Sequence, residues 1–318
     1  MKQEYIGSLD IGGTKTIAAI CGTDGTIYEK MQFPTNRMDY VAHFTNCCAI
    51  LHKLGEKKRI TIESLLGVGI NMPGMMDYSR GLLLHAPFAS WKDLPVRDFF
   101  RNLLKKDTVF IDNDVKSCAL GEKYFGLKNK YKDYIWVTIS TGIGAALVLD
   151  GKIYRGNNNL AGELGHIKVE FNNPRICTCG KKGCLEAYAS GTAITKSVLQ
   201  AIEKNPSFIQ KLDAKAYSHD AKGCGELAAE GDRIALGIYS DAAEYMARGF
   251  ASVINLINPQ AIILGGGVVN SIDLFLPEIQ KRIKNYAVDQ ASETEIVKTR
   301  LGYEAALIGT IALVLENL

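Results

Sequence analysis

The beginning of the chain is repeated in its middle, and this repeat constrains the fold more than any other feature of the sequence. Residues 5 to 28 contain, in order, a Tyr-Ile pair, a bend with two adjacent glycines and the run Asp-Gly-Thr-Ile-Tyr. Residues 134 to 154 contain a Tyr-Ile pair, a glycine bend and the run Asp-Gly-Lys-Ile-Tyr. The offset of roughly 130 residues is far too long for a solenoid repeat. The repeat therefore predicts two related domains, each opening with three strands bent by glycine. A chance likeness of two hairpins is the alternative.

The size and composition of the chain agree with this division. A length of 318 residues suits two mid-sized domains or one large one. The net charge of +3 gives no reason to expect nucleic acid as a partner, and no apolar run reaches the roughly 20 residues that a membrane span needs. The first residues carry no export signal, so we expect a cytoplasmic protein whose eight cysteines are reduced thiols or metal ligands.

Hydrophobic periodicity and turn residues predict alternating strands and helices after the first three strands. We expect strands at Tyr5–Ile11, Thr16–Cys21, Ile27–Met31, Leu65–Ile70, Thr108–Ile111 and Ala261–Leu264, and helices at Asp39–Leu54, Asp114–Phe125 and Asp232–Ile257. Residues 204 to 225 are expected to form a loop. In the first helix, the pattern places His43 and His52 on the solvated face, and one of Cys47 and Cys48 in the core.

Three glycine bends follow predicted strands, and together they indicate a nucleotide site. At Gly12-Gly13, close backbone approach and successive N–H groups would suit a phosphate, and Asp10 could hold a hydrated Mg²⁺. This bend has neither the Walker spacing nor the dinucleotide fingerprint, so an ordinary hairpin turn is the alternative. The second bend is Ser140–Gly144. The third, Gly265–Gly267, could admit an adenine or a ribose.

Asp114 lies where a short strand meets a helix. An aspartate at such a junction is by default an N-cap. The carboxyl end of a strand is also where α/β folds place their ligands, so a carboxylate poised in a cleft is the competing interpretation.

Three cysteines within eight residues give the sharpest local signal. Cys177, Cys179 and Cys184 have the spacing of metal ligands, and His166 is the nearest candidate for a fourth ligand. A closed site with three cysteines and one histidine would bind a structural Zn²⁺. The alternative is three unpaired thiols on a loop.

The sequence resembles the ROK family of repressors and sugar kinases. The likeness is carried by Leu9–Lys15, by Ala161–His166, by the cysteine run with Glu186 and Ala189–Gly191, and by Ile263–Gly267. It implies a two-domain α/β architecture, the actin-like, hexokinase-type (ribonuclease H-like) fold with duplicated βββαβα units. Residues 1–113, completed by the C-terminal helix at about 303–318, would form the first domain, and residues 114–302, with a zinc loop at 166–184, the second.

The resemblance also implies the activity and the roles of individual residues. The expected reaction is ATP-dependent phosphorylation of a hexose, usually at the 6-hydroxyl, with Asp114 as general base and a homodimer or homotetramer as the assembly. The residues implied in sugar binding are Gly74, Asn113, Glu163, His166 and Glu186. Those implied in binding ATP and Mg²⁺ are Asp10, Gly12, Gly13, Thr14, Lys15, Thr141, Gly142, Gly265, Gly266 and Gly267. The implied ligands of the structural Zn²⁺ are His166, Cys177, Cys179 and Cys184.

The sequence departs from the family pattern at Lys116 and at Pro87, and the second departure leaves the sugar open. Lys116 stands where the family usually has asparagine, and Pro87 replaces an asparagine that lies near the sugar in many members. Glucose, fructose, allose, mannose, N-acetylmannosamine, N-acetylglucosamine and a glucoside all remain candidates. A repressor is disfavoured because only nine residues precede Asp10, too few for a DNA-reading helix pair. An inactive sugar-binding protein is the other alternative, although Asp10, Asp114 and the glycines are all present.

Overall fold

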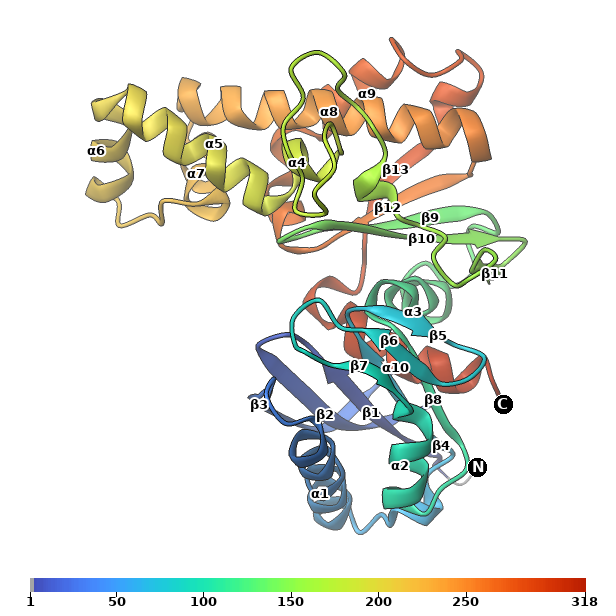
Figure 1. Cartoon of the computed structure of the whole chain (residues 1–318). Helices are drawn as coiled ribbons and strands as arrows, with labels where there is room; N and C mark the ends of the chain where they lie inside the picture. Colours follow the sequence, from blue (N-terminus) through green and yellow to red (C-terminus); the bar gives the residue numbers. More distant parts are fainter. Residues whose placement is uncertain (1–2) are drawn as a thin grey trace. The chain divides into compact units, whose positions relative to one another are not determined.

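The structure is a computed structural model that describes residues 3–318, and these divide into two compact units. The first unit holds the described residues up to Lys132, residues 146–161 and residues 299–318, and the second holds residues 133–145 and 162–298. The chain contains two five-stranded sheets with helices packed against them (Figure 1); the first lies in the first unit, and the second includes strands from residues 146–161. Among residues 3–318, no helix is both long and apolar enough to cross a lipid bilayer.

The two sheets share one strand order, which matches the sequence repeat. The first runs β3-β2-β1-β4-β8 and the second β11-β10-β9-β12-β13. The strands of the first are β1 (Tyr5–Ile11), β2 (Lys15–Gly22), β3 (Ile27–Pro34), β4 (Gly67–Met72) and β8 (Val109–Asn113). Those of the second are β9 (Tyr134–Ile139), β10 (Ile143–Leu149), β11 (Lys152–Tyr154), β12 (Ala261–Gly265) and β13 (Glu295–Lys298). A small third sheet joins β5 (Met75–Asp77), β6 (Leu82–His85) and β7 (Lys92–Leu94).

Strands β1, β2 and β4 of the first sheet are buried on both faces, which explains their largely apolar sequences. Successive strand residues point to opposite faces. Accordingly, Ala18 and Ile20 pack into the core beneath α1 (Tyr40–Lys58) and α2 (Val96–Leu104). Their neighbours Ala19 and Cys21 pack against α10 (Ala305–Leu315) on the other face (Figure 1). The last helix of the chain therefore completes the core of the first unit.

Helix α3 (Asp114–Gly121) belongs to the first unit, whereas the sequence placed the second domain from residue 114 onward. The reason is tertiary packing, because α3 lies against α10. The predicted helix to Phe125 changes character after Gly121, where residues Glu122–Gly126 form a π-helical turn.

The second unit contains helices where the sequence predicted a loop. Its helices are α4 (Glu186–Ala189), α5 (Gly191–Lys204), α6 (Pro206–Ala214), α7 (Ala221–Ala229), α8 (Arg233–Ile257) and α9 (Leu276–Ile283). The loop prediction at 204–225 was wrong because α6 and α7 are short and depend on neighbours. Phe208 and Leu212 of α6 are fully buried, and Asp220 caps α7 by accepting a hydrogen bond from the Gly223 N–H.

The prediction of an exposed His43 was also wrong. His43 is only 2% exposed, and both Cys47 and Cys48 are buried. Its ring contacts those of Phe33, Phe44 and Trp91. Trp91 comes from a segment almost fifty residues away, so the pattern of the helix alone could not show that His43 is covered.

Candidate functional site

Three polar side chains lie in register at the carboxyl ends of parallel strands in the first unit. Asp10 of β1 pairs with Asn71 of β4, and Asn71 pairs with Asp112 of β8. The Asn71 side chain is fully buried and donates from Nδ2 to the carbonyl oxygen of Ala306, 2.7 Å away. This edge of the sheet is where α/β folds bind ligands.

Asp114 is the first residue of α3 and not its cap. The cap is Asn113, whose side chain accepts from the N–H groups of Val115 at 2.9 Å and Lys116 at 3.4 Å. The interpretation of Asp114 as N-cap was therefore wrong, and its carboxylate is left for other contacts. The Nδ2 of Asn113 also donates to the carbonyl oxygen of Gly74 at 3.1 Å, which links two of the residues expected to bind sugar.

Asp10 and Asp114 are two half-buried residues whose carboxyl groups lie close enough to interact. Burial raises the pKa of Asp10 to about 7, the negative charge of Asp114 contributes to the rise, and Lys15 opposes it. Burial also raises the pKa of Asp114 to about 6, opposed by the backbone N–H groups of Val115 and Asp114 and by Lys116. Paired carboxyl groups with displaced pKa values are typical of active sites.

The first glycine bend is tightly closed. The Gly12 N–H donates to the Lys15 carbonyl oxygen at 2.9 Å, and a Cβ at Gly12 would lie 2.8 Å from that same oxygen. Only glycine fits there. Thr14 and Lys15 are exposed, so the bend presents them to solvent. Phe88 packs behind Gly13, next to an open cavity of 610 Å³ lined by residues 35–38 and 87–90, which includes Pro87.

A buried ion pair beside Asp114 was not predicted from the sequence. Asp112 is 1% exposed and accepts two hydrogen bonds from the Arg155 guanidinium, at 3.0 and 2.7 Å. The guanidinium also lies 3.6 Å from the centre of the Tyr78 ring. No sequence pattern pointed to Arg155, because its partners lie 43 and 77 residues away.

We expect Arg155→Met to destabilise the protein by about 3 kcal/mol, because it leaves a buried carboxylate without its partner. Urea denaturation would measure this change. Arg80→Met is the matched control, since Arg80 is mostly exposed and lies 4.0 Å from Asp77, and such surface pairs contribute little. Equal stability losses in the two variants would contradict a special role for the buried pair.

In the second unit, Glu186 joins the second glycine bend to the cysteine loop. Its carboxylate accepts from the Ile143 N–H at 2.9 Å and from the Thr178 hydroxyl at 2.8 Å. Next to it, Thr192 at the start of α5 donates to the Thr141 carbonyl oxygen at 2.8 Å. Thr141, Thr178, Glu186 and Thr192 line a pocket of 400 Å³, and two cationic residues, Arg175 and Lys196, line it as well. The structure thus brings Thr141, Gly142 and Glu186 together.

The third glycine bend has a structural explanation of its own. A Cβ at Gly265 would lie 2.5 Å from the Trp136 ring. Gly266 has a φ of 95°, and a Cβ there would lie 2.4 Å from the Ile139 carbonyl oxygen. Close packing against β9 therefore requires both glycines. Gly267 has open space at its Cβ position.

His166, Cys177, Cys179 and Cys184 gather in a cluster of side chains with the chemistry of metal ligands. Their ligand atoms all lie within 4.8 Å of one another. The Cys177 Sγ lies 3.8 Å from the His166 Nδ1, and the Cys179 Sγ lies 3.8 Å from the Cys184 Sγ. Zn–S bonds of about 2.3 Å in a tetrahedron put neighbouring ligands roughly 3.8 Å apart, so this donor set fits Zn²⁺. The other ring nitrogen of His166 faces Glu163 at 3.8 Å.

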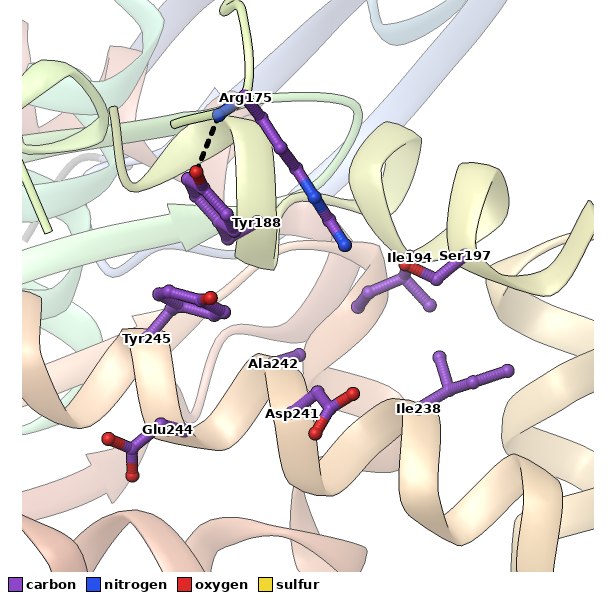
Figure 2. A pocket seen from close by; sticks show the side chains of 9 residues that line it. All are labelled: Arg175, Tyr188, Ile194, Ser197, Ile238, Asp241, Ala242, Glu244 and Tyr245. Carbon is purple, nitrogen blue, oxygen red and sulfur yellow. Dashed lines mark hydrogen bonds between the residues drawn. The ribbon is translucent and has the colours of Figure 1, made fainter. Parts of the chain in front are cut away.

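A second, smaller pocket lies where the cysteine loop meets α8. Figure 2 shows Arg175 extending past Tyr188 toward Ser197, with Tyr245 beside Tyr188. The rings of Tyr188 and Tyr245 are stacked at 4.1 Å, and Tyr188 accepts a hydrogen bond from the Arg175 N–H at 2.6 Å. The volume of 190 Å³ is below the roughly 300 Å³ of typical ligand pockets. These contacts hold the cysteine loop on α8.

Comparison with known proteins decides the family. Residues 6–317 match the sequence profile of the ROK family. This chain belongs to the ROK family. It is 33% identical to the glucokinase of Halalkalibacterium halodurans, over 96% of this chain and 93% of that protein. It is 31% identical to a xylose repressor of Caldicellulosiruptor bescii, over 85% of this chain and 67% of that protein.

Solved structures confirm the expected hexokinase-type, actin-like fold. A ROK glucokinase from Streptomyces griseus, crystallised with glucose and AMPPNP, has a TM-score of 0.83 and 28% identity, and the match covers 98% of this chain and 99% of that one. A ROK hexokinase from Thermus thermophilus has a TM-score of 0.76 and 27% identity over 98% of this chain and 99% of that one. The resemblance to the ROK family that the motifs indicated is thereby confirmed.

Proposed function

We propose that this ROK protein is a hexose kinase that transfers the γ-phosphoryl group of ATP to the 6-hydroxyl of its sugar, with Asp114 as general base. One observation carries the proposal. Two half-buried carboxyl groups with raised pKa values, Asp10 and Asp114, lie together at the carboxyl end of the first sheet, beside the glycine bend. The likeness to glucokinases over almost the whole chain supports the choice of hexose and ATP.

Asp114 has the properties that a general base for this reaction needs. Phosphoryl transfer depends on positioning and charge neutralisation, and the attacking hydroxyl must lose its proton as the new bond forms. A carboxylate with a pKa of about 6 is mostly ionised at neutral pH yet accepts a proton more readily than an ordinary aspartate. The Asn113 cap fixes the start of α3 and hence the position of Asp114.

The remaining roles are assigned within each unit. In the first, Asp10 would bind hydrated Mg²⁺, Gly12 to Lys15 would receive phosphate, and Asn113 with Gly74 would bind sugar hydroxyls. In the second, Glu163, His166 and Glu186 would bind sugar, Thr141 and Gly142 phosphate, and Gly265 to Gly267 adenosine. Mg²⁺ supplies neutralising charge for the phosphates. The positions of Asn113 against Gly74 and of Glu186 against the Ile143 N–H support these groupings.

We also propose that His166, Cys177, Cys179 and Cys184 hold a structural Zn²⁺. Four protein ligands leave no open coordination position, so the ion would take no part in the chemistry. Its role would be to fix the loop that carries Thr178, which donates to Glu186.

We expect kcat/KM to fall tenfold per pH unit below about pH 6, because the general base must be deprotonated and its pKa is about 6. Protonation of Asp10, whose pKa is about 7, should also weaken Mg²⁺ activation as the pH falls. Rate profiles between pH 5 and 9 at several Mg²⁺ concentrations separate the two effects. A flat profile through pH 6 would contradict the assigned base.

The test of the function is ADP release from ATP with a panel of sugars. The panel contains glucose, fructose, allose, mannose, N-acetylmannosamine, N-acetylglucosamine and a β-glucoside, and Asp114→Asn serves as the inactive control. A high kcat/KM with one sugar would establish the substrate. NMR of the product would show whether the phosphate is on the 6-hydroxyl. Absence of ADP release with every sugar would refute the kinase.

The second candidate is a sugar-binding regulatory protein without catalysis. It is kept because several curated relatives are xylose repressors at about 30% identity. The paired carboxyl groups favour the kinase, since binding alone does not require a base of raised pKa. Sugar binding by calorimetry without ADP release would support the regulatory protein. Sedimentation of the same sample would test the proposed homodimer or homotetramer.

A further inference from the structure

A series of hydrogen-bonded side chains supports the glycine bend at residues 12–15. None of these side chains has a role in the proposed catalysis. The Thr35 hydroxyl donates to the Gly12 carbonyl oxygen at 2.8 Å. The hydroxyls of Thr35 and Thr16 are 2.9 Å apart, and the Thr16 hydroxyl is 2.9 Å from the His43 Nε2. Thr16 is fully buried and His43 is 2% exposed, so water does not compete for the contact between them, whereas Thr35 is half-buried.

The contacts determine which group donates and which accepts in each of these hydrogen bonds. The His43 Nδ1 faces the N–H of Asn36 at 3.3 Å, so this nitrogen must be the acceptor. In the neutral ring, Nε2 then carries the proton and donates to Thr16. Because Thr35 uses its only hydroxyl proton on Gly12, Thr16 must donate to Thr35. Each hydroxyl thus accepts one bond and donates one.

The surroundings of His43 keep its ring neutral. Burial lowers the pKa of His43 to about 4. The nearest thiol, Cys47, lies 3.8 Å from Nε2, and burial raises the pKa of that thiol, so it remains uncharged. The chain of hydrogen bonds is therefore complete at neutral pH.

Holding the Gly12 carbonyl also fixes the direction of the next N–H. In a trans peptide the C=O and the N–H point to opposite sides. Since the Gly12 carbonyl points back toward Thr35, the Gly13 N–H points away from Thr35. Because both residues are glycines, the peptide between them can rotate at little steric cost. Such a rotation would place the Gly12 carbonyl oxygen where the Gly13 N–H had been.

We propose that His43, Thr16 and Thr35 are positioning residues that orient the Gly12–Gly13 peptide so that the Gly13 N–H meets a phosphate of the bound nucleotide. The inference rests on the proposed function, in which this bend receives phosphate. Loss of the chain frees the peptide to turn, and a carbonyl dipole facing the phosphate repels it. The effect belongs to nucleotide binding and does not extend to sugar binding.

Steady-state kinetics on Thr35→Val and Thr16→Val tests the inference, because valine has the shape of threonine without its hydroxyl. We expect the KM for ATP to rise about tenfold in each variant, the effect of losing one intramolecular hydrogen bond, while the KM for the sugar stays within about twofold. Thr35→Ser and Thr16→Ser restore the hydroxyl and should restore the KM for ATP. Thr310→Val is the control, since Thr310 is as buried as Thr16 but donates to the Leu307 carbonyl oxygen near the start of α10.

Direct binding of AMPPNP, measured by calorimetry, keeps the test independent of turnover. Wild-type protein must bind the nucleotide; if it does not, the proposed function itself fails. If wild type binds and both valine variants bind equally well, the inference is overturned. A parallel rise of both KM values, or a serine variant as impaired as the valine one, would also overturn it. In the double variant, a loss no larger than that of Thr35→Val alone would support a chain acting in series.

Discussion

Asp114→Asn should lower kcat by about two to four orders of magnitude, the contribution expected of a positioned general base. Asparagine keeps the size and much of the hydrogen bonding of aspartate but cannot accept the proton of the sugar hydroxyl. The KM for the sugar should change little, because Asn113 and Gly74 are untouched. The measurement is ADP release at saturating ATP and sugar, together with sugar binding by calorimetry.

The stability of the same variant separates chemistry from folding. The pKa of Asp114 is raised to about 6 in the folded protein, so the ionised carboxylate that predominates above pH 6 destabilises the folded state relative to the unfolded chain. Removing the charge should therefore leave the melting temperature at neutral pH unchanged or slightly higher. Asp220→Asn is the matched control, since Asp220 caps α7 in the second unit and asparagine caps equally well. Turnover by Asp114→Asn equal to that of this control would refute the assigned base.

Loss of the zinc cluster should have the largest effect on stability. Cys179→Ser removes one of the four proposed ligands, and we expect a purified variant to lose its metal and to melt well below wild type. Structural Zn²⁺ contributes roughly 10 kcal/mol or more of apparent binding free energy in small zinc domains, so even a fraction of that is large for one substitution. Elemental analysis and calorimetric melting measure the two effects.

Cys224→Ser is the control for this experiment. Cys224 is a buried cysteine of the same unit that lies near the Ala235 carbonyl and outside the cluster. It should retain one Zn²⁺ per chain, whatever its stability. Chelation of wild-type protein should reproduce the melting temperature of Cys179→Ser. Wild-type protein that contains no stoichiometric metal would contradict the structural zinc.

Local patterns predicted much of the fold because the chain itself imposes them. The first three strands, helix α8 after its Asp232 cap and strand β12 all lie close to their predicted positions. Each is specified by the periodicity and turn residues of its own segment. Short elements were harder. Helices α6 and α7 are stabilised by the burial of Phe208, Leu212 and Cys224 against neighbouring elements. The sequences of these two helices alone do not reveal that burial.

The candidate site likewise has features that the sequence predicted and features that only the tertiary structure decided. The sequence alone determined which residue types stand at the strand ends, where the glycine bends fall and which cysteines are close enough to share a metal, because short spacings along a chain limit the distances in space. Only the tertiary structure decided that Asn113 and not Asp114 caps α3, that Arg155 pairs with Asp112 and that His43 is buried. Burial and hydrogen-bond partners depend on residues that are distant in the sequence. They set the pKa values of Asp10 and Asp114 and the direction of the Gly12 carbonyl, on which the proposed chemistry depends.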